Sequence, residues 1–180
     1  MKVIKLKFLP DFIPKIRMGK KTVTRRLAQL IRQEPDDPLE CEESFRGVAP
    51  GDLAWVPERF KICSSINPLT VQYPGRERLG IFPDDSWFTA PRMPMWAART
   101  WIEFVSFRVE HLQLITPEDA KLEGLESVEE FRTIWDGLGR SRGMGLHSQW
   151  EDNPCVWRVE FKYVDDSDAR NRVHAARAYR

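Results

Sequence analysis

Four cations crowd the eight residues from Gly19 to Arg26, which read Gly-Lys-Lys-Thr-Val-Thr-Arg-Arg. Like charges packed this closely repel one another, and this repulsion is expected to lower the pKa of at least one lysine. A neutral lysine can take the proton of a nearby hydroxyl, so Lys21 and Thr24, three residues apart, fit a base and a nucleophile. The same charges also fit a basic loop that faces phosphate, and the residue types leave both interpretations open.

Other kinds of reactive site have less support in the sequence. The histidines and cysteines are scattered, without HxH, HxxxH or CxxC spacing, at His111, His147, His174, Cys41, Cys63 and Cys155. We therefore expect no zinc or iron site, no disulfide framework and no cofactor. The Gly-rich run at 137–145 lacks the order of a phosphate-binding loop and is predicted to be a mobile loop. A Ser-His-Asp triad lacks the supporting G-x-S-x-G elbow.

The elements that position residues 19–26 begin at the start of the chain. Residues 3–8 alternate apolar and basic side chains, which predicts a strand. Residues 11–18 predict a short helix that Gly19 ends in the left-handed conformation. Residues 33–50 are acidic and contain prolines, so they are expected to form a loop, after which Gly51 turns into a strand. Residues 61–95 are rich in Pro and Gly and are interpreted as an insertion with a hairpin near residues 69–73.

The second half of the chain has more regular patterns. Residues 100–109 predict a strand buried on both sides, with Ile102 and Phe104 on one face and Trp101, Val105, Phe107 and Val109 on the other. Thr116 and Ser127 each begin a capping box, which predicts one helix closed by Gly124 and a second running to Leu138. Residues 157–163 alternate regularly and predict the last strand. The polar residues 165–180 are interpreted as a loose tail, with a frayed helix as the alternative.

Strands near both ends and short helices between them predict an α+β fold with a barrel-like sheet, formed by one domain over residues 1–164. The 180 residues are 42% apolar and include seven Trp and ten Phe, which excludes a mostly disordered chain. No apolar run reaches the roughly 20 residues that cross a bilayer. The first ten residues also lack the apolar stretch of a signal peptide. The expected location is the cytoplasm, without a membrane partner.

Charge is unevenly distributed, although the net charge is only +1. Ten Lys or Arg and one acid lie between Lys2 and Arg32, whereas Glu34–Glu58 and Glu110–Asp136 each contain eight acids. The basic N-terminal part suits phosphate or nucleic acid, but the acidic stretches argue against a protein that coats a nucleic-acid backbone.

The run at 19–26 resembles the signature of ASCH domains, G-x-K-x-x-E-x-R, which Gly19, Lys21 and Arg26 match. The similarity continues through residues 51–60, 93–99, 115–124, 131–136 and 153–161, and so covers most of residues 1–164. It implies a PUA-like β-barrel with short flanking helices. Thr24 stands where the general signature has Glu, and a smaller ASCH group, the N4-acetylcytidine amidohydrolases, also has Thr at this place.

The resemblance to this smaller group implies a catalytic set of Lys21, Thr24 and Glu123, in which Glu123 follows from aligning a short helical segment with residues 115–123. These residues would remove acyl groups from the exocyclic amine of cytidine. Backbone amides near Gly19–Thr22 are candidates for an oxyanion hole. Arg26 and Glu58 are candidates for positioning the substrate, and a salt bridge of Glu58 to Arg26 or Arg59 is the alternative. A carboxylate beside Lys21 would raise its pKa and so oppose its role as a base.

The leading hypothesis is therefore an enzyme that hydrolyses N4-acylcytidine, with a small nucleoside as its partner and neither metal nor cofactor. The first alternative is a non-catalytic PUA-like module that binds RNA through its basic part and its tryptophans. The second is a ribonuclease. Binding alone requires neither Thr24 nor Glu123, so these two residues separate the hypotheses.

Overall fold

The computed structural model describes residues 1–28, 30–31, 40–41, 44–63, 70–74, 87–142 and 148–178. The strands are β1 (Val3–Lys5), β2 (Val23–Leu27), β3 (Leu30–Ile31), β4 (Glu40–Cys41), β5 (Leu53–Trp55), β6 (Lys61–Cys63), β7 (Thr70–Gln72), β8 (Trp101–His111) and β9 (Cys155–Val164). The helices are α1 (Phe12–Arg17), α2 (Pro117–Leu122), α3 (Val128–Arg142) and α4 (Asp166–Ala178), with short 3-10 turns at Ala90–Arg92, Met95–Ala97, Leu112–Leu114 and Trp150–Asp152. No helix in this described part of the chain has the length and apolar character that a membrane span requires.

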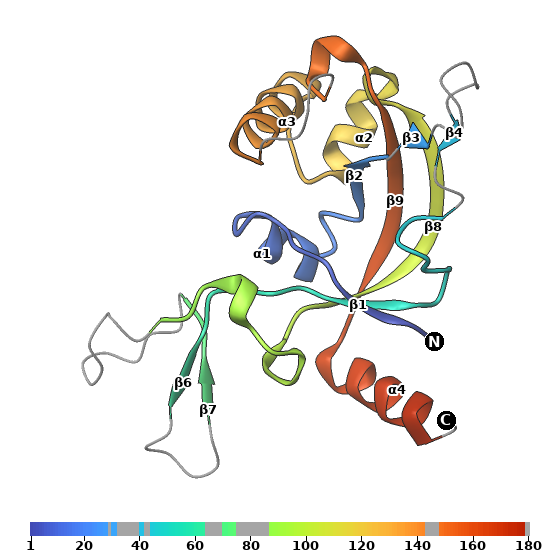
Figure 1. Cartoon of the computed structure of the whole chain (residues 1–180). Coiled ribbons are helices and arrows are strands. Elements are labelled where there is room, and N and C mark those ends of the chain that lie inside the picture. Colours follow the sequence, from blue (N-terminus) through green and yellow to red (C-terminus); the bar gives the residue numbers. More distant parts are fainter. Residues whose placement is uncertain are drawn as a thin grey trace.

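One five-stranded sheet organises the molecule, in the order β1-β5-β8-β9-β2. β1 and β5 are parallel, and every other neighbouring pair is antiparallel. Figure 1 shows the long strands β8 and β9 curving together, with α2 and α3 near one end and α4 near the other. The expected α+β class is confirmed. Among the described strands, β1 and β2 are the two edge strands of this sheet.

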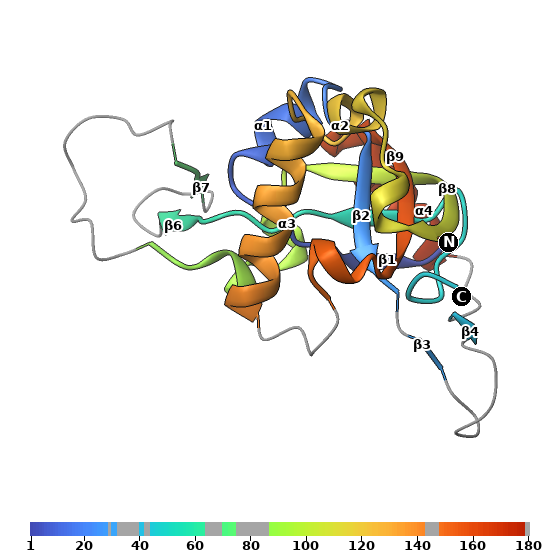
Figure 2. The same ribbon diagram turned by 90° about the horizontal axis from the view of Figure 1, so that it is seen from above.

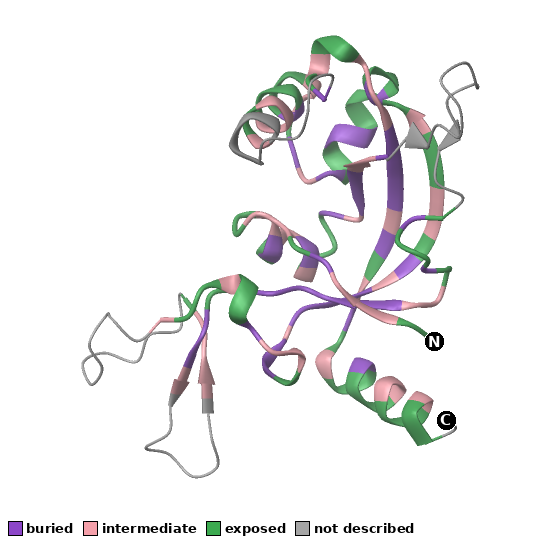
Figure 3. Cartoon of the chain, in the orientation of Figure 1, coloured by how far each residue is buried: buried purple, intermediate pink, exposed green. Residues whose placement is uncertain are grey.

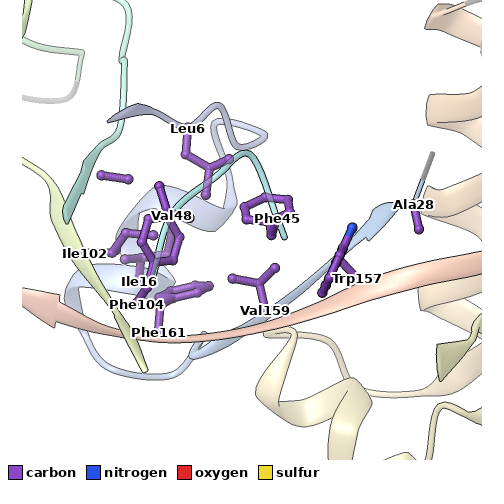
Figure 4. Packing of buried hydrophobic residues seen from close by; sticks show 11 residues of the cluster. Leu6, Ile16, Ala28, Phe45, Val48, Ile102, Phe104, Trp157, Val159 and Phe161 are labelled. Atoms are coloured by element: carbon purple, nitrogen blue, oxygen red, sulfur yellow. The ribbon is translucent and has the colours of Figure 1, made fainter. Parts of the chain in front are cut away.

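The core beneath α1 joins the two halves of the sheet. Figure 4 shows Leu6, Ile16, Phe104 and Phe161 gathered in one cluster, and all of them are buried. A second cluster packs α2 and α3 against β9 through residues such as Phe131. Buried segments therefore run along both β5 and β9, as Figure 3 shows. The core fixes the relative positions of α1, β2 and α2.

Local signals in the sequence predicted several boundaries correctly. α1 ends at Arg17, and Gly19 has a φ of 69°. The Thr116 side chain caps α2 by accepting a hydrogen bond from the Asp119 amide at 3.1 Å. A hairpin is present, formed by β6 and β7, but residues 70–72 are its second strand and the first lies earlier than expected, at Lys61–Cys63. Figures 1 and 2 both show this hairpin projecting from the sheet. That residues 61–95 are an insertion stays a prediction.

A bulge in β8 makes part of the predicted face pattern wrong. Phe104 pairs with Phe161 and Ser106 with Glu160, so Val105 is an extra residue in β8. An extra residue shifts the alternation by one position. Phe107 therefore packs on the same core as Phe104, and Val105 is 45% exposed. β5 pairs with β8 only over Trp101–Glu103. Accordingly, β8 is buried on both faces only in its first part, before the bulge.

The structure decides between the two interpretations of residues 165–180: Asp166–Ala178 form the helix α4, so the loose tail is wrong for the described residues. Ala169 is fully buried, and Val173 packs on the cluster that contains Trp101. Trp101 Nε1 donates to Asp166 Oδ1 at 2.9 Å, and Arg170 Nη2 donates to the carbonyl of Ala98 at 2.7 Å. The helix is thus part of the folded domain.

The Gly-rich run at 137–145 also differs from its prediction as a mobile loop. Residues 137–142 continue α3 as helix, and residues 143–147 lie outside the described part of the chain. Within the loop predicted over residues 33–50, the described residues 44–50 are bends and turns, and Phe45 and Val48 pack into the core beneath α1. Glu40–Cys41 form β4 and pair with β3, so the loop prediction is wrong there, and its remaining residues lie outside the described part of the chain.

Candidate functional site

The turn between α1 and β2 directs Lys21 into the protein. The positive φ of Gly19 lets the chain fold back so that the amides of Lys20 and Lys21 both donate to the Lys15 carbonyl, at 2.9 and 3.1 Å. The Thr22 amide then donates to the Leu122 carbonyl at 2.9 Å. These bonds fasten the turn to both helices, so the Lys21 side chain lies between them.

Because of these hydrogen bonds, the backbone amides of the turn do not form the expected oxyanion hole. The amides of Gly19, Lys20, Lys21 and Thr22 all donate to backbone carbonyls within the fold. An amide that is already donating along another direction cannot point at a substrate oxygen. The prediction that this turn supplies an oxyanion hole is therefore wrong for the folded chain.

The Lys21 ammonium is almost completely buried, at 2% exposure. Its Nζ donates to Glu123 Oε2 at 2.6 Å, to the Glu123 carbonyl at 2.8 Å and to the Val23 carbonyl at 2.9 Å. The ring centroid of Phe12 lies 4.5 Å from the same nitrogen. Three acceptors match the three N–H groups of a protonated lysine, so this arrangement holds the resting, charged form.

Opposing influences set the proton affinity of Lys21. Burial lowers its pKa, the charge and hydrogen bond of Glu123 raise it, and the charges of Arg26 and Arg25 lower it. The net direction is downward. Burial and the charges of Arg26 and Arg25 thus outweigh the upward influence of Glu123 on this pKa, while the three hydrogen bonds hold the protonated form at rest.

Glu123 reaches Lys21 because α2 ends beside the turn. Glu123 is the first residue after the helix, and its amide donates to the Asp119 carbonyl at 2.8 Å. Gly124 follows with a φ of 81°. A Cβ at this position would lie 3.1 Å from Lys15 Cδ and 3.3 Å from Lys21 Cβ. Glycine is therefore required for this close approach of the two segments.

Thr24 lies on β2, opposite Val159 of β9. It is 5% exposed, and its hydroxyl makes no hydrogen bond to the residues that the structure describes. The hydroxyl is therefore available to a ligand, although no hydrogen bond joins it to Lys21 in the resting arrangement.

A buried network of charges surrounds Lys21 and Glu123, and its other members, Arg25, Glu110, Asp119 and Arg158, were not among the candidates from the sequence. Arg25 Nη2 lies 2.6 Å from Glu110 Oε1 and 2.5 Å from Asp119 Oδ2, and Arg25 Nη1 lies 3.5 Å from Glu123 Oε1. Arg158 of β9, expected on a polar face, is also buried and lies 2.9 Å from Asp119 Oδ1. Since both arginines are on strands and Asp119 is on α2, the network joins α2 to the sheet.

Lys21, Thr24 and Glu123 line a single pocket between the segment after β1, α1, β2 and α3. Figure 2 shows α3 running alongside β2 and α1. The polar lining residues are Lys7, Lys21, Thr24, Arg25, Arg26 and Glu123, and the apolar ones are Phe8, Leu9, Phe12, Leu27, Leu125, Phe131, Ile134, Trp135 and Leu138. An apolar pocket with a few converging polar groups is the usual form of a small-molecule site.

The two residues proposed for substrate positioning lie in different places. Arg26 lines the pocket, and its Nη2 donates to the Lys7 carbonyl at 2.6 Å. Glu58 does not line this pocket. Its carboxylate accepts hydrogen bonds from Arg99 Nη2 and Thr100 Oγ1, each at 2.8 Å. The prediction that Glu58 positions substrate in this pocket is therefore wrong. The alternative, a salt bridge of Glu58 to Arg26 or Arg59, is also wrong, because Glu58 pairs with Arg99.

Metal-ligating side chains do not gather in groups of three or more among the residues that the structure describes.

Comparisons with known proteins give fold-level similarities only. No protein-family model matches the sequence, and no curated protein matches it. An ASCH domain from Lactobacillus crispatus is similar in structure, with a TM-score of 0.47 and 13% identity, over 91% of this chain and 80% of the other. The hypothetical protein PH0355 has a TM-score of 0.42 and 15% identity, over 91% of this chain and 100% of the other. Identities and TM-scores this low assign neither a family nor an activity.

Proposed function

We propose that this pocket is the active site of an amidohydrolase that removes acyl groups from the N4 amine of acylated cytidine or cytosine. The observation that carries the proposal is that Lys21, Thr24 and Glu123, which come from three segments of the chain, line one pocket. The 2.6 Å contact between Lys21 and Glu123 joins residues 102 positions apart in the sequence. The sequence resemblance to the N4-acetylcytidine amidohydrolases suggests the substrate.

The shape and lining of the pocket suit a flat base with an apolar substituent. Phe131 and Trp135 stack on one another with ring centroids 5.9 Å apart, and both face the pocket. Trp135 Nε1 donates to the Ser148 carbonyl at 2.8 Å, which fixes the indole. Rigid aromatic walls of this kind favour planar ligands.

The reaction requires Lys21 to become neutral first. Its lone pair then accepts the proton of the Thr24 hydroxyl while the oxygen forms a bond to the acyl carbon. The bond from the acyl carbon to N4 breaks, and the proton passes from Lys21 to N4, so cytidine leaves as a neutral amine. Water then attacks the acyl carbon of the Thr24 ester and gives up a proton to Lys21. The bond from the acyl carbon to the Thr24 oxygen breaks, Lys21 returns the proton to that oxygen, and the carboxylic acid leaves. Arg26 is the pocket side chain we assign to stabilising the negative oxygen of each addition step.

The experiment is to incubate the purified protein with N4-acetylcytidine and to follow cytidine by chromatography. Lys21→Arg keeps a positive charge, but a guanidinium does not release its proton at working pH. The variant should therefore lose hydrolysis by at least about a hundredfold. Lys121→Arg, on the exposed side of α2, is the matched control and should behave as the wild type. Thermal melting shows whether each variant is folded.

Two results would overturn the proposal. Absence of cytidine release by the folded wild type would exclude the activity, and normal hydrolysis by Lys21→Arg would exclude Lys21 as the base. RNA affinity measured on the same variants tests the alternative of a binding module, since arginine holds phosphate at least as well as lysine.

A further inference from the structure

We propose that Arg25 is a positioning residue of this site, a role that rests on the proposed function: its guanidinium holds the Glu123 carboxylate so that Lys21 can release its proton and act as the base. Arg25 lies outside the Lys21, Thr24 and Arg26 positions that the sequence resemblance identified. Its side chain is fully buried and reaches the pocket from β2.

The two oxygens of Glu123 face two different cations. Oε2 accepts the hydrogen bond of Lys21 at 2.6 Å, and Oε1 lies 3.5 Å from Arg25 Nη1. When Lys21 is protonated, Lys21 and Glu123 together are neutral. When Lys21 loses its proton, the pair has a charge of −1, which a neighbouring guanidinium stabilises strongly in a buried site.

Arg25 is held in this position by contacts that do not involve the pair. Its Nη2 lies 2.5 Å from Asp119 Oδ2, and its Nε donates to Glu110 Oε1 at 2.8 Å. The Phe131 ring centroid lies 5.9 Å from its Cζ. Because α2, β8 and α3 all contact the guanidinium, Arg25 cannot turn away when Lys21 changes charge.

The other charged groups around Lys21 are consistent with this role. They are Lys15 of α1, Arg26 of β2, Glu110 of β8, and Asp119 and Glu123 of the α2 segment. Asp119 and Glu110 are each paired with arginine, and Lys15 Nζ donates to the Gly124 carbonyl at 2.6 Å. Burial lowers the pKa of Lys21, Glu123 raises it, and Arg26 and Arg25 lower it again.

Arg158 provides a matched control within the same network. It is buried and pairs with Asp119, as Arg25 does, but its other ion pair is with Glu160 and it does not line the pocket. Removing either guanidinium therefore leaves Asp119 with one partner. Only the loss of Arg25 takes a positive charge from Glu123.

The experiment compares Arg25→Gln, Arg25→Lys, Arg158→Gln and the wild type in two measurements. The first is the dependence of kcat/KM for N4-acetylcytidine on pH. The second is the ¹⁵N NMR titration of the Lys21 side chain, assigned with Lys21→Met, which does not depend on activity. Arg25→Gln should move both transitions upward by about one pH unit, which lowers kcat/KM about tenfold below the transition and restores it at high pH.

Arg25→Lys should shift both transitions in the same direction by less, because one ammonium cannot span Asp119, Glu110 and Glu123 together. Because Arg25→Lys keeps a positive charge beside the buried carboxylates, this variant tests the inference even if Arg25→Gln does not fold. Unshifted transitions in the folded Arg25 variants, or an equal shift in Arg158→Gln, would overturn the inference. If the wild type releases no cytidine, the proposed function fails, while the NMR titration still tests Arg25.

Discussion

At the scale of single residues, the basic run at 19–26 contains side chains in very different environments. Lys20 is exposed, whereas Lys21 and Arg25 are buried at 2% and 4% exposure with carboxylate partners. Three buried cations, Lys21, Arg25 and Arg158, face three acids, Glu110, Asp119 and Glu123. A balanced network of this kind avoids the several kcal/mol that an unpaired buried charge costs. Lys21 and Arg25 therefore belong to a buried charge network, whereas Lys20 of the same run faces solvent.

Thr24→Ala tests the proposed nucleophile. Without the hydroxyl no acyl-enzyme can form, so release of cytidine from N4-acetylcytidine should become undetectable. The melting temperature should change by only a few degrees, because the hydroxyl makes no hydrogen bond to the described residues and its loss leaves no polar partner unsatisfied. Chromatography and thermal melting measure the two effects.

Thr24→Ser should keep part of the activity because it retains the oxygen. Thr133→Ala, which removes an exposed hydroxyl on α3, is the control and should leave turnover unchanged. Near-normal rates in Thr24→Ala would show that water attacks the substrate directly, without a threonine ester.

At the scale of elements, α2 contributes more to the site than its six residues suggest. Its N-terminal part supplies Asp119, which pairs with arginines on β2 and β9, and Glu123 follows its last turn. The helix begins at the Thr116 cap and closes at Gly124. Because these two local signals fix its length, Asp119 and Glu123 are one helical turn apart on the side that faces β2.

Deleting α4 by ending the chain at Val164 tests the role of this helix in the domain. The truncation would expose the surfaces of Trp101 and Val164 that pack with Ala169 and would remove the pairing of Arg172 with Glu103. Burial of these apolar groups is worth at least about 2 kcal/mol. The free energy of unfolding, measured in urea, should fall by at least that amount.

The matched control is a chain that ends at Ala178, which keeps the contacts described for α4 and should unfold as the full chain does. A truncation at Val164 with unchanged stability would show that the helix packs without stabilising the sheet, as the sequence alone suggested.

At the scale of the whole molecule, stability should depend on acidic groups paired in the fold. Burial raises the pKa of Asp119, but hydrogen bonds from Arg158 and the charge of Arg25 outweigh it and lower the pKa overall. A carboxyl with a lowered folded pKa stabilises the protein above its unfolded value and loses this contribution as pH falls through the folded value. Glu160 acts in the same direction, with its pKa lowered chiefly by the Ser106 hydrogen bond.

The corresponding experiment is urea unfolding of the wild type and of Asp119→Asn from pH 7 down to pH 3. The variant should be less stable by about 3 kcal/mol at pH 7, because Arg25 and Arg158 lose a buried partner. The difference should narrow as pH falls below about 4, where Asp119 takes up a proton in the unfolded wild type while the folded carboxyl, with its lowered pKa, stays charged. Glu160→Gln should show a smaller effect of the same sign, and Asp168→Asn, an exposed change on α4, is the control for removal of a surface carboxylate. A constant difference across the range would contradict the assignment.

Features that depend on residues close together in the chain could be predicted from the sequence. Gly19 stops α1, Thr116 caps α2, and the alternation in residues 157–163 appears as β9. These signals are local because capping and alternation involve hydrogen bonds and faces within a few residues. The resemblance to a known family also selected Lys21, Thr24 and Glu123, which the fold brings to one pocket, while their catalytic roles stay a proposal.

Which charges meet and which faces are covered could not be predicted from the sequence and is known from the folded chain. Arg25 contacts Asp119 across 94 positions, and Glu58 is taken up by Arg99 at a separate place. The bulge at Val105 places Phe107 on the other face of β8 from the one predicted. The polar C-terminal segment forms a helix that packs against Trp101. Such outcomes depend on contacts between segments distant in the chain, whose energies no local pattern contains. The pairing that controls the protonation of Lys21 is of this kind, because burial and three neighbouring charges act on it together.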